Sequence, residues 1–185
     1  MKPLPNFSTI PASTDRERLP VGGYVLKITG VEDNVKMEYL RVIYDIAEGP
    51  EKGRYSDEWA NEHIYAHAFI RSYKDTARGM FKAWLVAVDE SNGTKFVDTV
   101  EAGLKEAQLV GKIFGAVIGE EEYKTDLGDI KTRLYVASVM SADRIRKGDY
   151  KLPAFKPYKG KAGDGMKPAP TVTFSNPLKE DDLPF

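Results

Sequence analysis

The chain has 185 residues, of which 42% are hydrophobic and 30% charged, a composition that suits one globular domain with additional segments. It contains no Cys and two His, which excludes disulfide frameworks, Cys-ligated metal sites and thiol nucleophiles. Residues 1–20 lack the apolar stretch of a secretory signal, and no apolar run is long enough to span a membrane. We therefore expect a cytoplasmic protein. The net charge of −1 argues at first sight against a nucleic-acid partner.

Alternating apolar residues predict strands in the first part of the chain. The first strand covers residues 22–33 and the second residues 37–49, each with apolar side chains at every other position. Residues 49–53, with two glycines and a proline, predict the turn that follows. A third strand is predicted over residues 54–70, broken near Ala60.

The apolar period then changes to that of a helix. Apolar residues recur on one helical face between Ala77 and Val88, with Ser72 as a candidate N-cap and Asn92-Gly93 as a stop. This pattern predicts a helix over residues 74–90. A capping-box spacing from Asp98 to Glu101 predicts a second, shorter helix over residues 99–107.

Two further strands, residues 111–119 and 130–140, complete the expected order of elements. Five strands with a helix between the third and the fourth are the plan of the oligonucleotide/oligosaccharide-binding barrel, or OB-fold. Such barrels take their ligand on strands two and three and on the loops 1–2 and 4–5. The expected fold is therefore mainly β, with one or two helices, as a five-stranded OB-fold-like barrel. A mixed α+β sheet, for example of ferredoxin-like topology, is the alternative.

One segment contains candidate metal ligands, namely Asp57, Glu58, Glu62, His63 and His67. The two histidines have the i, i+4 spacing of zinc ligands on a helix, but the acidic base expected between them is missing and their neighbours favour a strand. The sequence also lacks a GxxxxGK[ST] phosphate loop and a GxSxG nucleophile elbow. We expect no metal, no cofactor and no enzymatic activity, and a metal-dependent nuclease is kept as the less favoured alternative.

Basic and aromatic side chains recur at outward positions of the predicted strands and beside them. Binding of a nucleic-acid single strand needs cations along the phosphates and rings on which bases stack, each stack contributing roughly 1 to 3 kcal/mol. The predicted interface consists of Lys27, Tyr39, Arg41, Arg54, Tyr55, Trp59, Arg133, Tyr135, Arg144 and Arg146. Taken singly, each of these residues also fits cross-strand packing or a solvated face.

The charges are unevenly distributed along the chain. Residues 151–185 hold six of the eleven prolines and predict an extended, disordered tail. Residues 151–178 carry a net charge of +4 and residues 179–185 a net charge of −2, which leaves −3 for residues 1–150. The near-zero total therefore permits a local surface for nucleic acid.

The last five residues combine an acidic pair with an apolar hook. They are Asp181, Asp182, Leu183, Pro184 and Phe185. Such a peptide suits a small hydrophobic pocket rimmed by Lys or Arg on a partner protein, and a flexible tether keeps its local concentration high. A generic acidic solubilising tail is the alternative, but it does not require Leu-Pro-Phe.

This ending, DDLPF, resembles the acidic C-terminal tip of bacterial and bacteriophage single-stranded DNA-binding proteins. Stretches within residues 20–153, among them YDIAEGPEKGRYSDEW and VGKIFGAVIGEEEY, resemble a family of bacteriophage and prophage proteins associated with replication and recombination. That family is taken to consist of single-stranded DNA-binding proteins of barrel type. The resemblance implies a location in the cytoplasm of a bacterial host cell. It also implies that Asp181 to Phe185 recruit helicase, primase, polymerase or recombination partners.

Together these patterns predict four segments: an N-terminal arm (1–18), an OB-fold domain that binds single-stranded DNA (19–153), a flexible basic linker (154–178) and an acidic partner-docking tip (179–185). The protein is expected to coat single-stranded DNA without strong sequence preference during phage replication or recombination and to recruit enzymes through the tip. We expect no membrane partner, and assembly into a homo-oligomer is left open. An adaptor that uses the tip without binding DNA is the main alternative.

Overall fold

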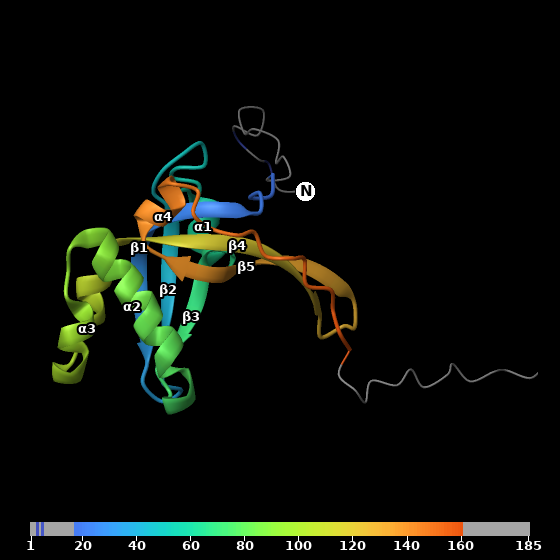
Figure 1. The fold of residues 1–185 in the computed structure, drawn as a ribbon. Helices are drawn as coiled ribbons and strands as arrows, with labels where there is room; N and C mark the ends of the chain where they lie inside the picture. Colours follow the sequence, from blue (N-terminus) through green and yellow to red (C-terminus); the bar gives the residue numbers. More distant parts are fainter. Residues whose placement is uncertain (1–2, 4, 6–16, 161–185) are drawn as a thin grey trace, which may run out of the picture.

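The computed structural model describes residues 3, 5 and 17–160. In this part of the chain, five strands form one antiparallel sheet in the order β3-β2-β1-β4-β5. The strands are β1 (Gly22–Asn34), β2 (Tyr39–Ile46), β3 (Ala68–Ser72), β4 (Ile113–Lys124) and β5 (Ile130–Met140). The β4–β5 hairpin projects from the body on one side, and the helices α2 and α3 lie on the other (Figure 1). The expected tip, Asp181 to Phe185, lies outside the described residues.

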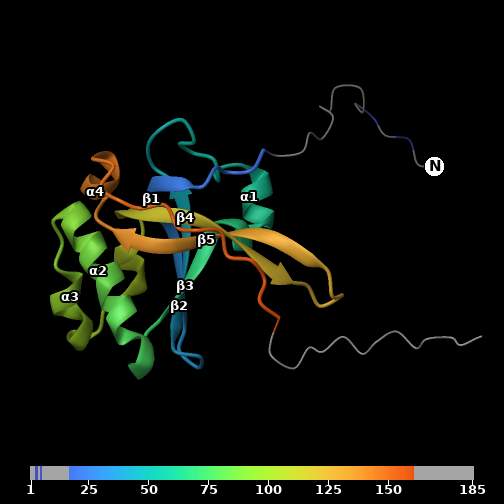
Figure 2. The ribbon, with the colours of Figure 1, turned by 45° about the vertical axis from the view of Figure 1, so that its right-hand side comes forward.

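The long strand β1 joins the two halves of the sheet. Residues 22–27 pair with β4, and residues 26–34 pair with β2. The register with β2 shifts between Ile28 and Gly30, as it does at a β-bulge, which bends a strand and increases its twist. β1 thus pairs with β4 at its start and with β2 further along. In Figures 1 and 2, the β4–β5 hairpin crosses β2 and β3.

The expected mainly β fold, with five strands and a helix between the third and the fourth, is confirmed. The sheet is not closed, however: no pairing joins β3 to β5 among the described residues. β3 has five residues, and all of its ladder partners are in β2. The structure is therefore an open, strongly bent sheet where the sequence predicted a barrel.

The third strand is shorter than predicted because the chain before it is helical. Residues Glu58–Glu62 form helix α1 and Ile64–His67 form the 3-10 helix η2, so only Ala68–Ser72 pair as a strand. Asp57 begins α1, since its side-chain oxygen accepts a hydrogen bond from the Ala60 N–H at 3.0 Å. This N-cap outweighs the weak alternation from which a strand was predicted.

The helix predicted over residues 74–90 is present in two parts. A 3-10 turn, η3 (Asp75–Ala77), leads into α2 (Arg78–Asn92), which ends at Gly93 with a φ of 64°. Left-handed φ values favour glycine because it has no Cβ. Trp84, Leu85 and Val88 of α2 are buried against the sheet, so the predicted apolar face is the core-facing one.

The second predicted helix, over residues 99–107, is wrong in its position. The chain forms α3 (Phe96–Thr99) and the 3-10 helices η4 (Val100–Ala102) and η5 (Glu106–Leu109). The carboxylate of Asp89 accepts hydrogen bonds from the Phe96 and Val97 N–H groups at 2.8 and 3.0 Å. Asp89, on the preceding helix, therefore caps α3, and the helical turn begins three residues before the predicted start.

The core fills the space between α2 and the inner face of the sheet. Its largest fully buried side chains are Trp84, Phe114, Leu26, Ile28, Ile46, Leu85, Leu109 and Ile118. On the other face of the β1–β4 pair lies the short helix α4 (Ala142–Arg146). A Cβ at Gly115 would stand 2.6 Å from the Ile145 side chain, so glycine at this position permits α4 to approach β4.

After α4 the chain turns back along β4. The Lys156 N–H donates to the Glu120 carbonyl at 3.2 Å, and the Glu122 N–H donates to the Lys156 carbonyl at 2.9 Å. The Tyr158 N–H donates to the Glu122 carboxylate at 2.9 Å. These contacts occupy the part of the β4 edge that β1 has left, and they run past Pro153, the expected end of the domain. Within residues 17–160, no helix is long and apolar enough to cross a membrane.

Candidate nucleic-acid interface

Three of the predicted interface residues lie on β1 and β2. Tyr39 and Arg41 are two residues apart on β2 and share a face of the sheet. Arg41 forms an ion pair of 3.0 Å with Glu32, its partner in the β1–β2 register. Lys27 is exposed on β1 and stands opposite Asp45. Each of these two cations therefore has an acidic residue as its cross-strand neighbour.

Arg54, Tyr55 and Trp59 follow β2 and have different environments. Tyr55 is buried in the core, where its ring stacks on His67 with centroids 4.8 Å apart. A buried ring offers no face to a base, so Tyr55 does not belong to the interface described below. The Arg54 guanidinium is largely buried and ion-paired with Glu51. Trp59 is exposed on α1, and its ring stacks on His63 at 4.4 Å.

Arg144 and Arg146 lie on α4 and are both ion-paired. Arg144 contacts Asp149 at 2.8 Å, and Arg146 contacts Glu48 and Asp143 at 2.6 Å each. The hydrogen bonds from Arg146 hold the pKa of the Glu48 carboxyl below its usual value. Exposed ion pairs are worth about 0 to 1 kcal/mol, so a phosphate can displace such a carboxylate, although the net positive charge is reduced.

The two remaining predicted residues, Arg133 and Tyr135, lie together on the β4–β5 hairpin. The register pairs Tyr123 with Lys131, Glu121 with Arg133 and Gly119 with Tyr135. Directly opposite residues share a face, as do residues two apart along a strand. We call the surface formed by Glu121, Tyr123, Lys131, Arg133, Tyr135 and Lys156 the hairpin face.

Rings and cations alternate on the hairpin face. The Arg133 guanidinium lies over the Tyr123 ring, 5.0 Å from its centroid, and also contacts Glu121 at 2.8 Å. The Lys156 ammonium lies 3.9 Å from the Tyr135 centroid. Lys131 is exposed at the outer end of the hairpin. This surface combines cations that suit the phosphates of a nucleic-acid single strand with rings that suit its bases.

Tyr135 has a further role within the structure. Its ring lies against Gly119, where an added Cβ would be 3.0 Å away, and its hydroxyl is buried without a hydrogen-bond partner among the described residues. Tyr135 therefore contacts β4 at Gly119 and the C-terminal segment at Lys156.

Sequence patterns did not single out Tyr123, Lys131 and Lys156. The predicted strand ended at residue 119, whereas β4 continues to Lys124. Lys156 falls in the part predicted to be a flexible linker, and its contact with β4 brings it beside Tyr135. Knowledge of the β4–β5 register would have placed Tyr123 and Lys131 on the same face of the hairpin as Arg133.

The candidate metal ligands do not converge. Among the residues that the structure describes, no group of three or more His, Asp and Glu side chains could hold a metal ion. His67 is buried, and its two ring nitrogens lie 2.8 Å from the Tyr44 carbonyl and 3.0 Å from the Ala60 carbonyl. The Nδ1 of His63 lies 2.8 Å from the Trp59 carbonyl. Both histidines thus serve the local fold.

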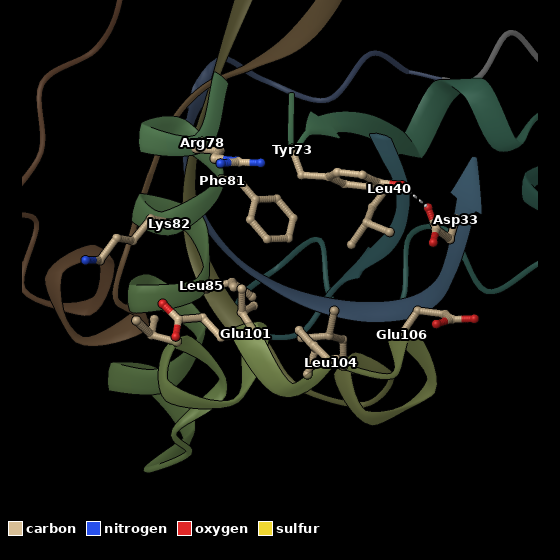
Figure 3. Close-up of a pocket in the computed structure, with 14 residues that line it drawn as sticks. Asp33, Leu40, Tyr73, Arg78, Phe81, Lys82, Leu85, Glu101, Leu104 and Glu106 are labelled. Carbon is tan, nitrogen blue, oxygen red and sulfur yellow. Dashed lines mark hydrogen bonds between the residues drawn. The ribbon is translucent and has the colours of Figure 1, made fainter. Parts of the chain in front are cut away.

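A separate groove of about 740 Å³ lies between α2 and the segment from α3 to η5 (Figure 3). Phe81, Leu85 and Leu104 contribute to its apolar lining, and Tyr73 donates a hydrogen bond to the Asp33 carboxylate at 2.9 Å. Partial burial and this bond raise the pKa of the Tyr73 hydroxyl. The groove contains none of the predicted interface residues and lies on the side of the molecule away from the β4–β5 hairpin.

No protein-family model matches the sequence, and no curated protein matches it. The function is therefore inferred from the geometry of the hairpin face and from the composition of the chain.

Proposed function

We propose that the chain binds single-stranded DNA without strong sequence preference, with the hairpin face as its main contact surface. The observation that carries this proposal is the alternation of rings and cations on that face, with Arg133 over Tyr123 and Lys156 over Tyr135. Stacking accepts any base because every base has a flat π-face, and cations that follow the backbone do not read sequence.

The C-terminal segment adds positive charge to this surface. Residues 151–160 contain three Lys and no acidic residue, and Lys156 lies directly on the hairpin. Glu121 is the acidic member of the face itself and is already paired with Arg133. The local balance is therefore positive although the net charge of the chain is −1. Because the net charge of the chain is low, stacking has to supply much of the affinity.

The order of the elements supports an open variant of the OB-fold as the framework. The strand order β3-β2-β1-β4-β5, with α2 between β3 and β4, is compatible with that fold, and OB-folds bind ligands through the loop between strands four and five. The projecting β4–β5 hairpin occupies that position. The face of β2 with Tyr39 and Arg41 would extend the same path.

The chemistry of the acidic tip favours docking to a partner protein. Asp181, Asp182, Leu183, Pro184 and Phe185 combine two carboxylates with an apolar end, which suits a partner pocket lined by apolar and basic groups. We propose that these residues recruit replication or recombination proteins to the bound strand in a bacterial host. In this proposal the protein performs no chemical step itself.

The decisive experiment is an equilibrium titration of the full chain with labelled oligo(dT) and with a duplex of equal length, at two salt concentrations. We expect binding of the single strand alone, with log K falling against log salt by about 0.7 for each phosphate neutralised. Equal affinity for the duplex would contradict the proposal. No binding at low salt would favour the adaptor without DNA contact, and loss of intact oligonucleotide on adding Mg²⁺ would favour a nuclease.

A further inference from the structure

Arg71 differs from every other arginine that the structure describes. Of the eight arginines within residues 17–160, seven have a carboxylate oxygen of a described residue within 4 Å, and Arg71 has none from that part of the chain. Those seven are Arg18, Arg41, Arg54, Arg78, Arg133, Arg144 and Arg146. The Nε of Arg71 is also inaccessible to solvent and has no hydrogen-bond partner among the described residues.

Arg71 is partly buried, so the absence of a carboxylate partner among the described residues costs free energy. It lies on β3 opposite Leu40, and its guanidinium lies over the Phe69 ring, 4.6 Å from the centroid. Phe69 in turn contacts the core rings of Trp84 and Phe114. Burial lowers the pKa of Arg71 to about 10, because the charged form loses hydration. A cation over a ring recovers part of that loss, about 0.5 to 2 kcal/mol.

Arg71 is also at the open side of the sheet. β3 and β5 are its two end strands and do not pair, yet both contact α2. Leu134 and Val136 of β5 pack against the same core as Phe69 of β3. Figures 1 and 2 both show β5 crossing β3. The unpaired guanidinium therefore lies on the strand that borders this opening, and β5 carries Arg133 and Tyr135 of the hairpin face.

We propose that Arg71 binds a phosphate of the DNA strand at the open side of the sheet, between β3 and β5. The guanidinium is a planar fork that donates two parallel hydrogen bonds to a phosphate, and such bonds are stronger in a partly desolvated position. In this proposal the DNA strand leaves the hairpin face across the free edge of β5 and continues to Arg71 on β3, the other end strand of the sheet. The inference rests on the proposed function and adds to it a phosphate site away from the hairpin.

Two variants with a matched control test the site. Arg71→Gln should weaken binding of the full chain to oligo(dT) by about tenfold or more at low salt, since a hydrogen-bonded charge is lost. It should also reduce the slope of log K against log salt by about 0.7, the value for one phosphate. Arg71→Lys keeps the charge without the fork and should recover the slope but only part of the affinity. Arg78→Gln, an exposed and ion-paired arginine on α2, should change neither.

The outcomes separate this inference from the function itself. If the unmodified chain does not bind oligo(dT), the proposed function fails. If it binds and Arg71→Gln binds with the same affinity and slope, the phosphate site is wrong. Thermal unfolding of each variant checks that it is folded. Arg71→Met should unfold at the same or a higher temperature than the unmodified chain if the unpaired cation does not stabilise the domain.

The carboxylates of residues 180–185 are the other candidate partner of Arg71. In a double-mutant cycle, deletion of residues 180–185 is combined with Arg71→Gln, and the unfolding temperature is measured without DNA. Additive effects support the assignment to a phosphate. A deletion that destabilises the unmodified chain but leaves Arg71→Gln unchanged would place the acidic tip on Arg71 and overturn that assignment.

Discussion

The Lys156 ammonium on the C-terminal segment lies over the Tyr135 ring on β5, 3.9 Å from the ring centroid. This contact joins two parts of the sequence that had been assigned to different roles, a stacking residue and a flexible linker. Because Lys156 also exchanges backbone hydrogen bonds with Glu120 and Glu122, the segment continues the sheet for a few residues beyond the domain. The hairpin face thus contains residues from both parts.

Tyr135→Ala is expected to loosen the C-terminal segment. A cation–π contact at a partly exposed site contributes about 0.5 to 2 kcal/mol, so its loss should raise local opening roughly 2- to 30-fold. Hydrogen exchange of the Lys156 and Glu122 amides would measure this change, since both amides bond across the segment. Phe155→Ala is the control, because Phe155 is exposed in the same segment. Unaltered protection in Tyr135→Ala would show that backbone pairing alone holds the segment.

Tyr123→Ala should weaken binding of oligo(dT) by about 5- to 150-fold, the range that corresponds to the loss of one stacked base at 1 to 3 kcal/mol. Unlike Arg133→Gln, it should leave the salt dependence of binding unchanged, because the ring carries no charge. Fluorescence anisotropy of a labelled oligonucleotide measures both quantities. Tyr65→Ala is the matched control, since Tyr65 is a highly exposed tyrosine outside the hairpin. An equal loss of affinity for oligo(dT) in both variants would mean that the hairpin face is not the main contact surface.

His67→Phe is expected to destabilise the domain. It keeps a ring against Tyr55 but removes the bonds to the Tyr44 and Ala60 carbonyls, at 2.8 and 3.0 Å. A buried polar group without a partner costs about 1 to 3 kcal/mol, so we expect that loss in the free energy of unfolding for the Tyr44 carbonyl. The Ala60 carbonyl keeps the bond from the His63 backbone N–H at 3.1 Å. Urea denaturation measures the loss. His63→Phe, at the surface beside Trp59, should cost less than about 1 kcal/mol. Zn²⁺ should stabilise neither protein.

Gly115→Ala and Gly79→Ala should have opposite effects on stability. A Cβ at Gly115 would lie 2.6 Å from both the Ile145 side chain and the Ser141 carbonyl, so α4 has to move, at a cost of about 1 to 3 kcal/mol. A Cβ at Gly79 on α2 meets nothing within 4 Å, and alanine there should stabilise the helix by about 0.5 to 1 kcal/mol. Thermal or urea unfolding distinguishes them. A neutral Gly115→Ala would show that α4 is not held against β4.

The parts of the fold that the sequence predicted have strong local patterns. The apolar face of α2, with Trp84 and Leu85, has the spacing of a helix and is followed by a glycine stop, so local and tertiary preferences agree. The segment before β3 gave the wrong result because an N-cap at Asp57 competes with alternating residues. Short helices of this kind depend on single hydrogen bonds that a periodic pattern does not contain.

The candidate site was only partly predictable for a different reason. The outer half of the β4–β5 hairpin projects from the body, so its strands need no apolar face, and Glu120 to Glu122 gave no sign of a strand. The contact between Lys156 and Tyr135 joins residues 21 positions apart through pairing that no local signal encodes. Arg71 was not selected because its distinguishing feature, the lack of a carboxylate partner, depends on the positions of all the acids around it.

Glu48 and Arg146 provide a test of pH dependence. Hydrogen bonds from Arg146 lower the pKa of the Glu48 carboxyl from its ordinary value of 4.5, and burial opposes this change. A carboxyl with a lower pKa in the folded state binds fewer protons there than in the unfolded chain. Its contribution to stability is therefore complete above about pH 4.5 and is lost as the pH falls through the lower, folded-state pKa.

Glu48→Gln should accordingly unfold at a slightly lower temperature than the unmodified chain at pH 7, and the difference should shrink as the pH is lowered below about 4.5. The effect is small because both side chains are partly exposed and solvent screens the pair. Glu90→Gln, at an exposed position of α2, is the control for the removal of one acidic charge from the surface. A Glu48→Gln difference that stays constant from pH 7 to pH 2 would show that the ion pair with Arg146 does not stabilise the fold in solution.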